Sequence, residues 1–297
     1  MSNLVFLTGG FSSGSTLLFT LFRKAGEFHC LYEPLHERLL ENLYGGLRVY
    51  EHHYHVDDYF TEYRGFTEIS RLYDPTWGGT GLALPPQTDA PELYRYLSYL
   101  IGMGFARRPK VLLKENRLAF RLAWMRARFP QARVIHIYRA CDAQWKSTVR
   151  RAQAFYGRQD VGQDSVTFNG MSMANACDDL ASTYPELAAE RSKTGYERFA
   201  KLWELTLAEN RKHSDLTVSF EELTRDFETV CGQIWSTAGC ETDYKPLEEW
   251  VVAPEQQETL KVRPRGLQSR LIMAVGRARL RYGRLRLTLA RLRRRSD

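Results

Sequence analysis

A glycine- and serine-rich segment near the N-terminus has the spacing of a phosphate-binding loop. Residues 9–16, GGFSSGST, match the outline G-x-x-x-x-G-x-[ST] and stand between an apolar run and a segment with helical periodicity. The backbone N–H groups of such a loop and the N-terminus of the following helix both favour a phosphate oxyanion. We therefore predict a phosphate site here, against the alternative of an ordinary glycine turn between a strand and a helix.

This loop lacks two features that a nucleotide triphosphatase needs. Ser15 occupies the place of the lysine that reaches the β- and γ-phosphates of a bound nucleotide. The apolar run at 134–138 is followed by Arg139, where a carboxylate that holds Mg²⁺ is expected. The loop therefore suits a nucleotide that carries an additional phosphate and binds without a metal ion. A small-molecule kinase with a degenerate loop remains the alternative.

Charged residues follow three further apolar runs. Glu33 comes directly after residues 28–32, Lys114 after 111–113, and Arg139 after 134–138. In open parallel sheets, ligands bind beyond the carboxyl ends of the strands. We therefore expect these side chains at one edge of a sheet, together with the loop. The alternative is that each charged residue only begins a surface loop.

Arg139, Ser147 and Arg151 have the spacing of a second phosphate site. A helix from about Asp142 would place Ser147 and Arg151, four residues apart, on one face just beyond Arg139. Two guanidinium groups and a hydroxyl suit a phosphate monoester, because arginine binds phosphate oxygens through paired hydrogen bonds. The alternative is that the basic residues of this helix form a solvated face.

The elements that would position these residues alternate between strands and helices. Strands are expected at 4–7, 28–32, 111–113, 134–138 and 216–220. Helices are expected after the loop as far as Gly26, near 91–105, at 118–130, from about 142, at 194–213 and at 221–238. This alternation predicts an α/β fold of three layers, with a central parallel sheet flanked by helices. We assign residues 1–260 to this domain and residues 261–297 to a basic, helical C-terminal tail.

The composition is that of a globular protein. Of the 297 residues, 43% are apolar and 26% are charged, so the chain has enough apolar surface to bury a core. The five cysteines are widely spaced and form no C-x-x-C pair, which argues against a disulfide framework and a structural zinc site. No run of 18 apolar residues and no signal-type leader occur. We therefore expect a cytoplasmic protein without a membrane-spanning helix.

The C-terminal tail concentrates the positive charge of the chain. Residues 261–297 carry a net charge of +12, which leaves −5 of the total of +7 for residues 1–260. As a helix the tail would be amphipathic, and its candidate targets are an anionic membrane surface, an anionic polymer or a partner protein. A solvated tail is the alternative. We do not expect nucleic acid as a partner, because the body is acidic and shows no recognition module.

Four segments resemble the P-loop sulfotransferase family, and its tyrosylprotein and carbohydrate branches most. GGFSSGSTLL resembles the family's 5′-phosphosulfate loop. VIHIYRACDAQWKSTVRRA resembles its 3′-phosphate segment, with Ser eight residues after Arg and a second Arg four residues later. LKENR and VSFEELTRDFETVCGQIWSTAG resemble two further family segments. The resemblance covers roughly residues 4–36 and 110–240.

The resemblance implies a P-loop fold and transfer of the sulfuryl group of 3′-phosphoadenosine 5′-phosphosulfate (PAPS) to an acceptor hydroxyl or amine, with no metal ion. The residues that would bind PAPS are Ser12, Ser13, Gly14, Ser15 and Thr16 in the loop, and Arg139, Ser147 and Arg151 at the 3′-phosphate. Glu33 falls where several branches keep the general base, and His36 on the same turn is the second candidate base. Lys114 falls where related branches keep a cation near the leaving oxygen.

One departure from the family concerns Ser12, because the family usually carries Arg or Lys at this place. Lys114, Arg23 or a tail arginine would have to supply the missing charge. Without such a charge the enzyme would be slow, or the chain would be a catalytically inactive homologue that binds a nucleotide, or a membrane through its tail. The acceptor stays open among glycans, phenols, peptide tyrosines and lipids.

Two further clusters have less specific interpretations. His52, His53 and His55 precede two carboxylates, but a polar surface loop is favoured over a metal site, and we predict no metal site in this chain. Seven aromatic residues suit an acceptor cleft and core packing equally well. They are Tyr50, Tyr54, Tyr59, Phe60, Tyr63, Tyr73 and Trp77.

Overall fold

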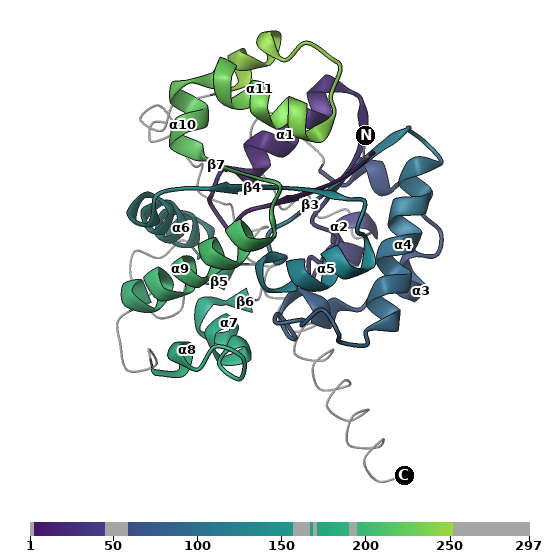
Figure 1. The fold of residues 1–297 in the computed structure, drawn as a ribbon. Helices are drawn as coiled ribbons and strands as arrows, with labels where there is room; N and C mark the ends of the chain where they lie inside the picture. The colour runs from purple at the N-terminus through teal and green to yellow at the C-terminus, as the bar shows by residue number, and fades with distance from the viewer. Residues whose placement is uncertain (1–2, 45–58, 157–166, 169–170, 190–194, 252–297) are drawn as a thin grey trace.

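The computed structural model describes residues 3–44, 59–156, 167–168, 171–189 and 195–251 (Figure 1). The histidine cluster at 52–55 and the basic tail from residue 261 lie outside these residues, and their interpretations stay predictions. None of the helices in the described ranges combines the length and the apolar composition of a membrane span.

A five-stranded parallel sheet lies at the centre of the molecule, in the strand order β2-β3-β1-β4-β7. Its strands are β1 (Leu4–Thr8), β2 (Phe28–Tyr32), β3 (Lys110–Glu115), β4 (Arg133–Tyr138) and β7 (Leu216–Ser219). All five strands predicted from the sequence are confirmed. A separate antiparallel pair consists of β5 (Thr167–Phe168) and β6 (Met171–Ser172).

Helices cover both faces of the sheet, which confirms the three layers of the expected α/β fold. α1, α10 and α11 lie on one face, and α5 and α9 lie on the other (Figure 1). The helices of the described residues are α1 (Ser15–Ala25), α2 (Leu39–Tyr44), α3 (Ile69–Leu72), α4 (Pro91–Phe105), α5 (Leu122–Arg128), α6 (Cys141–Tyr156), α7 (Met173–Leu180), α8 (Glu186–Ala189), α9 (Gly195–His213), α10 (Phe220–Arg225) and α11 (Phe227–Ala238). Short 3₁₀ turns lie at Thr61–Tyr63, Pro75–Gly78, Ala119–Arg121 and Lys245–Trp250.

The register of the sheet brings the carboxyl ends of its strands to one level. Thr8 at the end of β1 pairs with Glu115 of β3 on one side and with His136 of β4 on the other. Tyr32 at the end of β2 pairs with Lys114. Parallel strands that end together deliver the residues after them to the same edge, so the predicted meeting of the loop with the charged strand ends is confirmed.

One predicted helix is wrong in its continuity. The segment 221–238 forms two helices, α10 and α11, rather than one. The Ser219 side chain accepts from the N–H of Glu222 in a capping box, which starts α10 and ends β7 one residue before the predicted end. The Asp226 side chain accepts from the N–H of Thr229 and starts α11, because an N-cap takes a non-helical conformation that interrupts the chain of helical residues.

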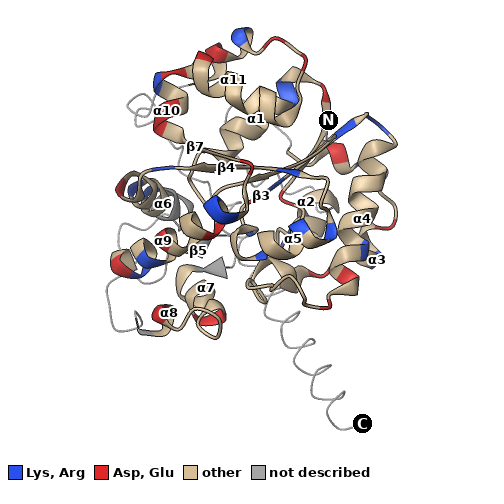
Figure 2. Ribbon diagram, in the orientation of Figure 1, with Lys and Arg blue, Asp and Glu red and all other residues tan. Residues whose placement is uncertain are grey.

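Charged residues are nearly absent from the middle of the sheet. In Figure 2 they lie on the helices and loops and at the ends of the strands. Within β3 they are Lys110 at the start and Lys114 and Glu115 at the end. Lys114 and Glu115 are nevertheless buried, at 0% and 1% exposure. Two buried charges at the carboxyl edge require partners, and these partners form the site described next.

Candidate active site

The segment between β1 and α1 forms a tight loop through two residues in the left-handed conformation. Gly14 has φ 94° and stands directly before Ser15, the first residue of α1. Ser12 has φ 64°, which is uncommon for a residue other than glycine. The N–H of Ser13 donates to the carbonyl of Gly10 at 3.2 Å and closes the turn. The loop therefore ends at a helix N-terminus, as phosphate binding requires.

Side chains of two neighbouring helices approach two glycines of the loop closely. A Cβ atom on Gly14 would lie 2.3 Å from the ring of Phe220 on α10, and one on Gly10 would lie 2.6 Å from Nε2 of Gln144 on α6. The same Nε2 donates to the carbonyl of Phe11 at 2.9 Å. Side chains of α6 and α10 therefore pack directly against the loop.

Two hydroxyl groups of the loop fit a phosphate ligand. The Oγ atoms of Ser12 and Ser13 are buried and have no hydrogen-bond partner among the described residues. Buried polar groups normally have partners, and an oxyanion would accept from both hydroxyls. Across the described ranges, no group of three or more His, Cys, Asp or Glu side chains could hold a metal ion. The loop thus fits a phosphate group through hydroxyl and N–H donors.

Glu33 lies directly after β2 and is held by a neighbouring strand. Its backbone has φ 41°, and its N–H donates to the carbonyl of Lys114 at 2.7 Å. Its carboxylate accepts from Nζ of Lys114 at 2.6 Å and from Nδ2 of Asn116 at 2.9 Å. A guanidinium nitrogen of Arg117 lies 3.5 Å from its other oxygen. Glu33 and Lys114, predicted from strand ends, therefore form one buried ion pair.

The surrounding charges keep Glu33 ionised. Burial by itself would raise the pKa of Glu33, but the ammonium of Lys114 and the guanidinium of Arg117 hold this pKa well below its usual value. Burial lowers the pKa of Lys114, and the Glu33 carboxylate opposes that change. The Glu33 carboxylate and the Lys114 amine, 2.6 Å apart, therefore each favour the charged form of the other.

Asn116 connects the phosphate loop with this ion pair, a role that the sequence did not reveal. Oγ of Ser15 donates to Oδ1 of Asn116 at 3.0 Å, and Nδ2 of Asn116 donates to Glu33 at 2.9 Å. The signal was present, because Asn116 stands just beyond the carboxyl end of β3, two residues after Lys114. A rule that considers uncharged amides at strand ends would have found it.

His36 is poorly arranged for the role of a general base. It is 1% exposed, and its Nδ1 accepts from the backbone N–H of Arg38 at 3.0 Å. A neutral imidazole with Nδ1 as acceptor carries its proton on Nε2 and has no free lone pair for another proton. Burial and the nearby cations lower the pKa of His36 to about 3, although Glu33 opposes this shift. The geometry favours Glu33 over His36.

The structure also bears on the charge missing at Ser12. Arg23 lies in the last turn of α1, at the opposite end of this helix from the loop, and pairs with Glu62 at 2.6 Å. Arg23 therefore does not supply a cation to the loop. A second cation lies nearer to the loop: the guanidinium of Arg117 is 5.2 Å from the ring of Phe11, which is a loop residue. It also contacts Glu37 at 2.6 Å, so that much of its charge is already neutralised.

The predicted 3′-phosphate segment begins close to the loop. The guanidinium of Arg139 lies 4.9 Å from the ring of Phe220, the ring that packs against Gly14, and 3.9 Å from Glu221. Ser147 is half-buried on α6. The side chain of Arg151 lies outside the described part of the structure, so the trio remains a prediction. Arg139 is nonetheless placed beside the loop, as a shared ligand requires.

A family model matches this chain, and two solved structures are similar to it. The model of the sulfotransferase family matches residues 5–244. A sulfotransferase domain from the curacin biosynthetic pathway is similar in structure, with 12% identity, coverage of 91% of this chain and 82% of that chain, and a TM-score of 0.41. A sulfotransferase from Alicyclobacillus acidocaldarius shows 12% identity, coverage of 82% and 85%, and a TM-score of 0.39. No curated protein matches the chain. Because the family model spans most of its length, the chain belongs to the sulfotransferase family.

Proposed function

We propose that this protein transfers the sulfuryl group of PAPS to the hydroxyl group of an acceptor. The observation that carries the proposal is the hydrogen-bonded path from Ser15 at the start of α1 through Asn116 to Glu33, with Lys114 on the same carboxylate. This path links an anion-binding loop directly to a buried acid–base pair. Group transfer from a phosphosulfate needs this combination, because a leaving phosphate and an acceptor proton must be handled side by side.

The residues that would hold the donor follow from the site. The loop from Ser12 to Thr16 would bind the 5′-phosphosulfate through N–H groups, hydroxyls and the N-terminus of α1. Arg139, Ser147 and Arg151 would bind the 3′-phosphate. When bound, PAPS supplies an activated sulfuryl group with a bisphosphate as its leaving group.

The chain's own residues would handle the charges of the reaction. Glu33 is ionised and would accept the proton of the acceptor hydroxyl. Lys114 would stabilise the negative charge that grows on the leaving phosphate. Asn116 would keep the carboxylate oriented, since its amide is fixed on its other side by Ser15. All five cysteines are free thiols, which supports our placement of this activity in the cytoplasm.

Ligand-induced stabilisation tests the donor assignment without a known acceptor. Adenosine 3′,5′-bisphosphate should raise the melting temperature of the protein, because a ligand that binds only the native state stabilises it. EDTA should leave this rise unchanged, and ATP with Mg²⁺ should produce much less. An equal rise with ATP and Mg²⁺ would contradict the donor assignment and favour the kinase alternative.

Turnover then separates an enzyme from an inactive homologue. Desulfation of PAPS should be measured against a panel of acceptors that includes phenols, sugars and aliphatic alcohols. Product formation with one class is the expected result. Tight bisphosphate binding without turnover on any acceptor would instead indicate a binding protein on a sulfotransferase fold, as the serine at position 12 allows.

A further inference from the structure

An aromatic pocket opens beside the loop and the Glu33 network. It is a cavity of about 130 Å³ between the sheet edge and the helices α6, α7 and α9. Gly10 and Phe11 of the loop line it, and so do Asn116 and Arg117. Asn116 is thus shared by the pocket and by the hydrogen-bonded path to Glu33. The polar end of the pocket therefore adjoins the proposed reaction centre.

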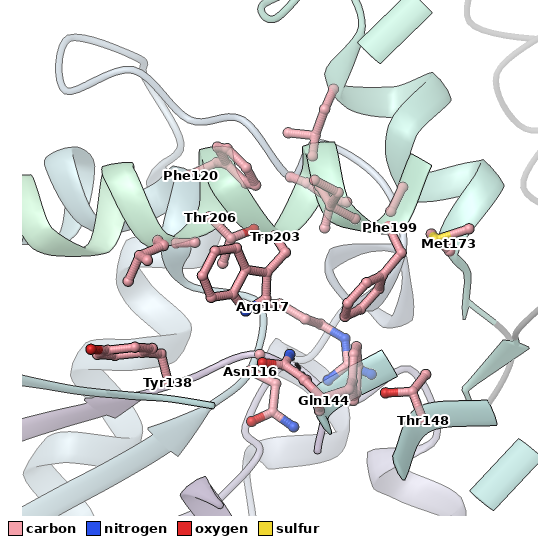
Figure 3. Close-up of a pocket in the computed structure, with 18 of the residues that line it drawn as sticks. Asn116, Arg117, Phe120, Tyr138, Gln144, Thr148, Met173, Phe199, Trp203 and Thr206 are labelled. Carbon is pink, nitrogen blue, oxygen red and sulfur yellow. Dashed lines mark hydrogen bonds between the residues drawn. The ribbon is translucent and has the colours of Figure 1, made fainter. Parts of the chain in front are cut away.

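Most of the pocket wall is apolar and much of it is aromatic. Four leucines and Met173 line it, together with six aromatic side chains: Phe11, Phe120, Tyr138, Trp145, Phe199 and Trp203. Figure 3 shows Phe120, Tyr138, Phe199 and Trp203 around the space, with the Asn116 amide below the Trp203 ring. Nε1 of Trp203 donates to the carbonyl of Arg139 at 3.0 Å, and the ring centroids of Trp145 and Phe199 lie 5.2 Å apart. The rings are therefore held in place.

The size and the apolar lining of the pocket favour some classes of acceptor over others. A cavity of about 150 Å³ lined by Leu, Ile and Phe is known to accommodate benzene, so this pocket has room for one six-membered ring. A sugar would bring several hydroxyls against an apolar wall, where unpaired polar groups are costly. An aromatic ring fits, and it gains edge-to-face contacts with the surrounding rings.

We propose that the acceptor is a phenol whose ring occupies this pocket and whose hydroxyl points to Asn116. This inference rests on the proposed sulfuryl transfer and specifies its substrate class. The phenol oxygen forms a bond to sulfur while its proton passes to the Glu33 carboxylate. The bond between sulfur and the bridging oxygen breaks, and its electron pair goes to the leaving phosphate.

The acidity of the acceptor is an independent argument for a phenol. Glu33 is a weak base, because Lys114 and Arg117 hold its pKa low against the effect of burial. A weak base takes a proton more readily from a phenol, with a pKa of about 10, than from an aliphatic alcohol, which is far less acidic. The same charges that keep Glu33 ionised therefore favour the phenol.

Calorimetric titration with 4-methylphenol tests the pocket directly. Thr206→Phe on α9 would fill the cavity, whereas Ala208→Phe adds the same ring at an exposed position of that helix. We expect Thr206→Phe to weaken 4-methylphenol binding at least 10-fold and Ala208→Phe to change it less than 2-fold. Leu207→Phe, also on the pocket wall, replaces Thr206→Phe if that variant does not fold. Unchanged binding in a folded pocket-filling variant overturns the inference, and so does equal affinity for 4-methylcyclohexanol.

Activity measurements separate this inference from the proposed function. Sulfation of 4-methylphenol, lowered at least 10-fold in kcat/KM by Thr206→Phe, supports both. Pocket binding of 4-methylphenol without sulfation of any acceptor contradicts the sulfuryl transfer alone. Sulfation of sugars or aliphatic alcohols but not of phenols contradicts the phenol inference alone. A tyrosine peptide assayed beside 4-methylphenol shows, by the higher kcat/KM, whether the phenol belongs to a polypeptide or to a free small molecule.

Discussion

Nζ of Lys114 lies 2.6 Å from Oε1 of Glu33, and the two side chains are 0% and 6% exposed. The proposed base and the cation proposed for the leaving group therefore form one ion pair across the carboxyl ends of β2 and β3. Such a pair is costly to break from one side only, because the remaining charge stays buried without its partner. Under the proposed function, the same ion pair would contribute to both stability and catalysis.

Lys114→Met should lower the free energy of unfolding by about 3 kcal/mol, since it leaves the Glu33 carboxylate without its closest cation. This loss lies at the lower end of the range for broken buried ion pairs, because the guanidinium of Arg117 remains 3.5 Å from the Glu33 carboxylate. Urea denaturation at pH 7 measures the loss of stability. The double variant Glu33→Gln, Lys114→Met should lose less stability than Lys114→Met alone, because it removes both charges. Additive losses would contradict the coupling.

Arg139→Ala should weaken the binding of adenosine 3′,5′-bisphosphate by about 10- to 100-fold, because it removes charge-assisted hydrogen bonds to the 3′-phosphate. Adenosine 5′-phosphate, which lacks the 3′-phosphate, should bind the variant and the parent protein alike. Calorimetry provides both affinities. Arg150→Ala, an exposed arginine on α6, is the control and should leave the bisphosphate affinity unchanged. Equal losses for the two nucleotides would place Arg139 elsewhere than at the 3′-phosphate.

Glu27 should stabilise the protein in a pH-dependent way. Burial would raise its pKa, but Lys110 and the N–H groups of Glu241 and Thr242 lower this pKa to about 2. A lowered folded pKa contributes stability above the unfolded value of about 4.5, and this contribution is lost as pH falls through about 2.

Glu27→Gln should therefore cost about 1–3 kcal/mol at pH 7 and progressively less below pH 5. Chemical denaturation over pH 2–7 provides the difference from the parent protein. Glu228→Gln is the control, because it breaks an ion pair with Lys245 in which the Glu228 and Lys245 side chains are 69% and 65% exposed. It should change the free energy of unfolding by less than about 1 kcal/mol. A cost for Glu27→Gln that stays constant down to pH 2 would contradict the lowered pKa.

Deletion of residues 261–297 tests the proposal that the basic tail binds an anionic surface. The full chain should adsorb to vesicles that contain phosphatidylserine, and the truncated chain should adsorb much less, because each lysine or arginine near such a surface contributes about 1 kcal/mol. High salt should abolish the difference. Equal adsorption of both chains at low salt would show that the tail is not the anchor.

The strands and the position of the loop could be predicted from the sequence because both depend on local patterns. Short apolar runs followed by glycine, glutamate, lysine or arginine mark β1, β2, β3 and β4, and their order along the chain implies parallel pairing. The break between α10 and α11 was missed, since Asp226 looks like an ordinary polar helix residue until its cap to Thr229 is seen.

The pocket could not be predicted, because its wall comes from distant parts of the chain. Phe11, Phe120, Trp145 and Trp203 meet only after the sheet and α9 have packed. Most of the described aromatic residues that the sequence suggested for an acceptor cleft are buried in the core instead, as Tyr59 is at 2% exposure. Tertiary packing decides which aromatic side chains line a cavity, and the spacing of aromatic residues along the chain does not predict this outcome.

The central claim is tested most directly by transfer of a radioactive sulfuryl group from PAPS to 4-methylphenol, catalysed by the parent protein and by Glu33→Gln. The account predicts labelled product with the parent protein and a kcat that is about 10²–10⁴-fold lower in the variant. Adenosine 3′,5′-bisphosphate should raise the melting temperature of the variant as much as that of the parent protein. His36→Gln should retain kcat within a few-fold of the parent if it folds. Full turnover in Glu33→Gln, or no transfer to any acceptor by a parent protein that binds the bisphosphate, would contradict the account.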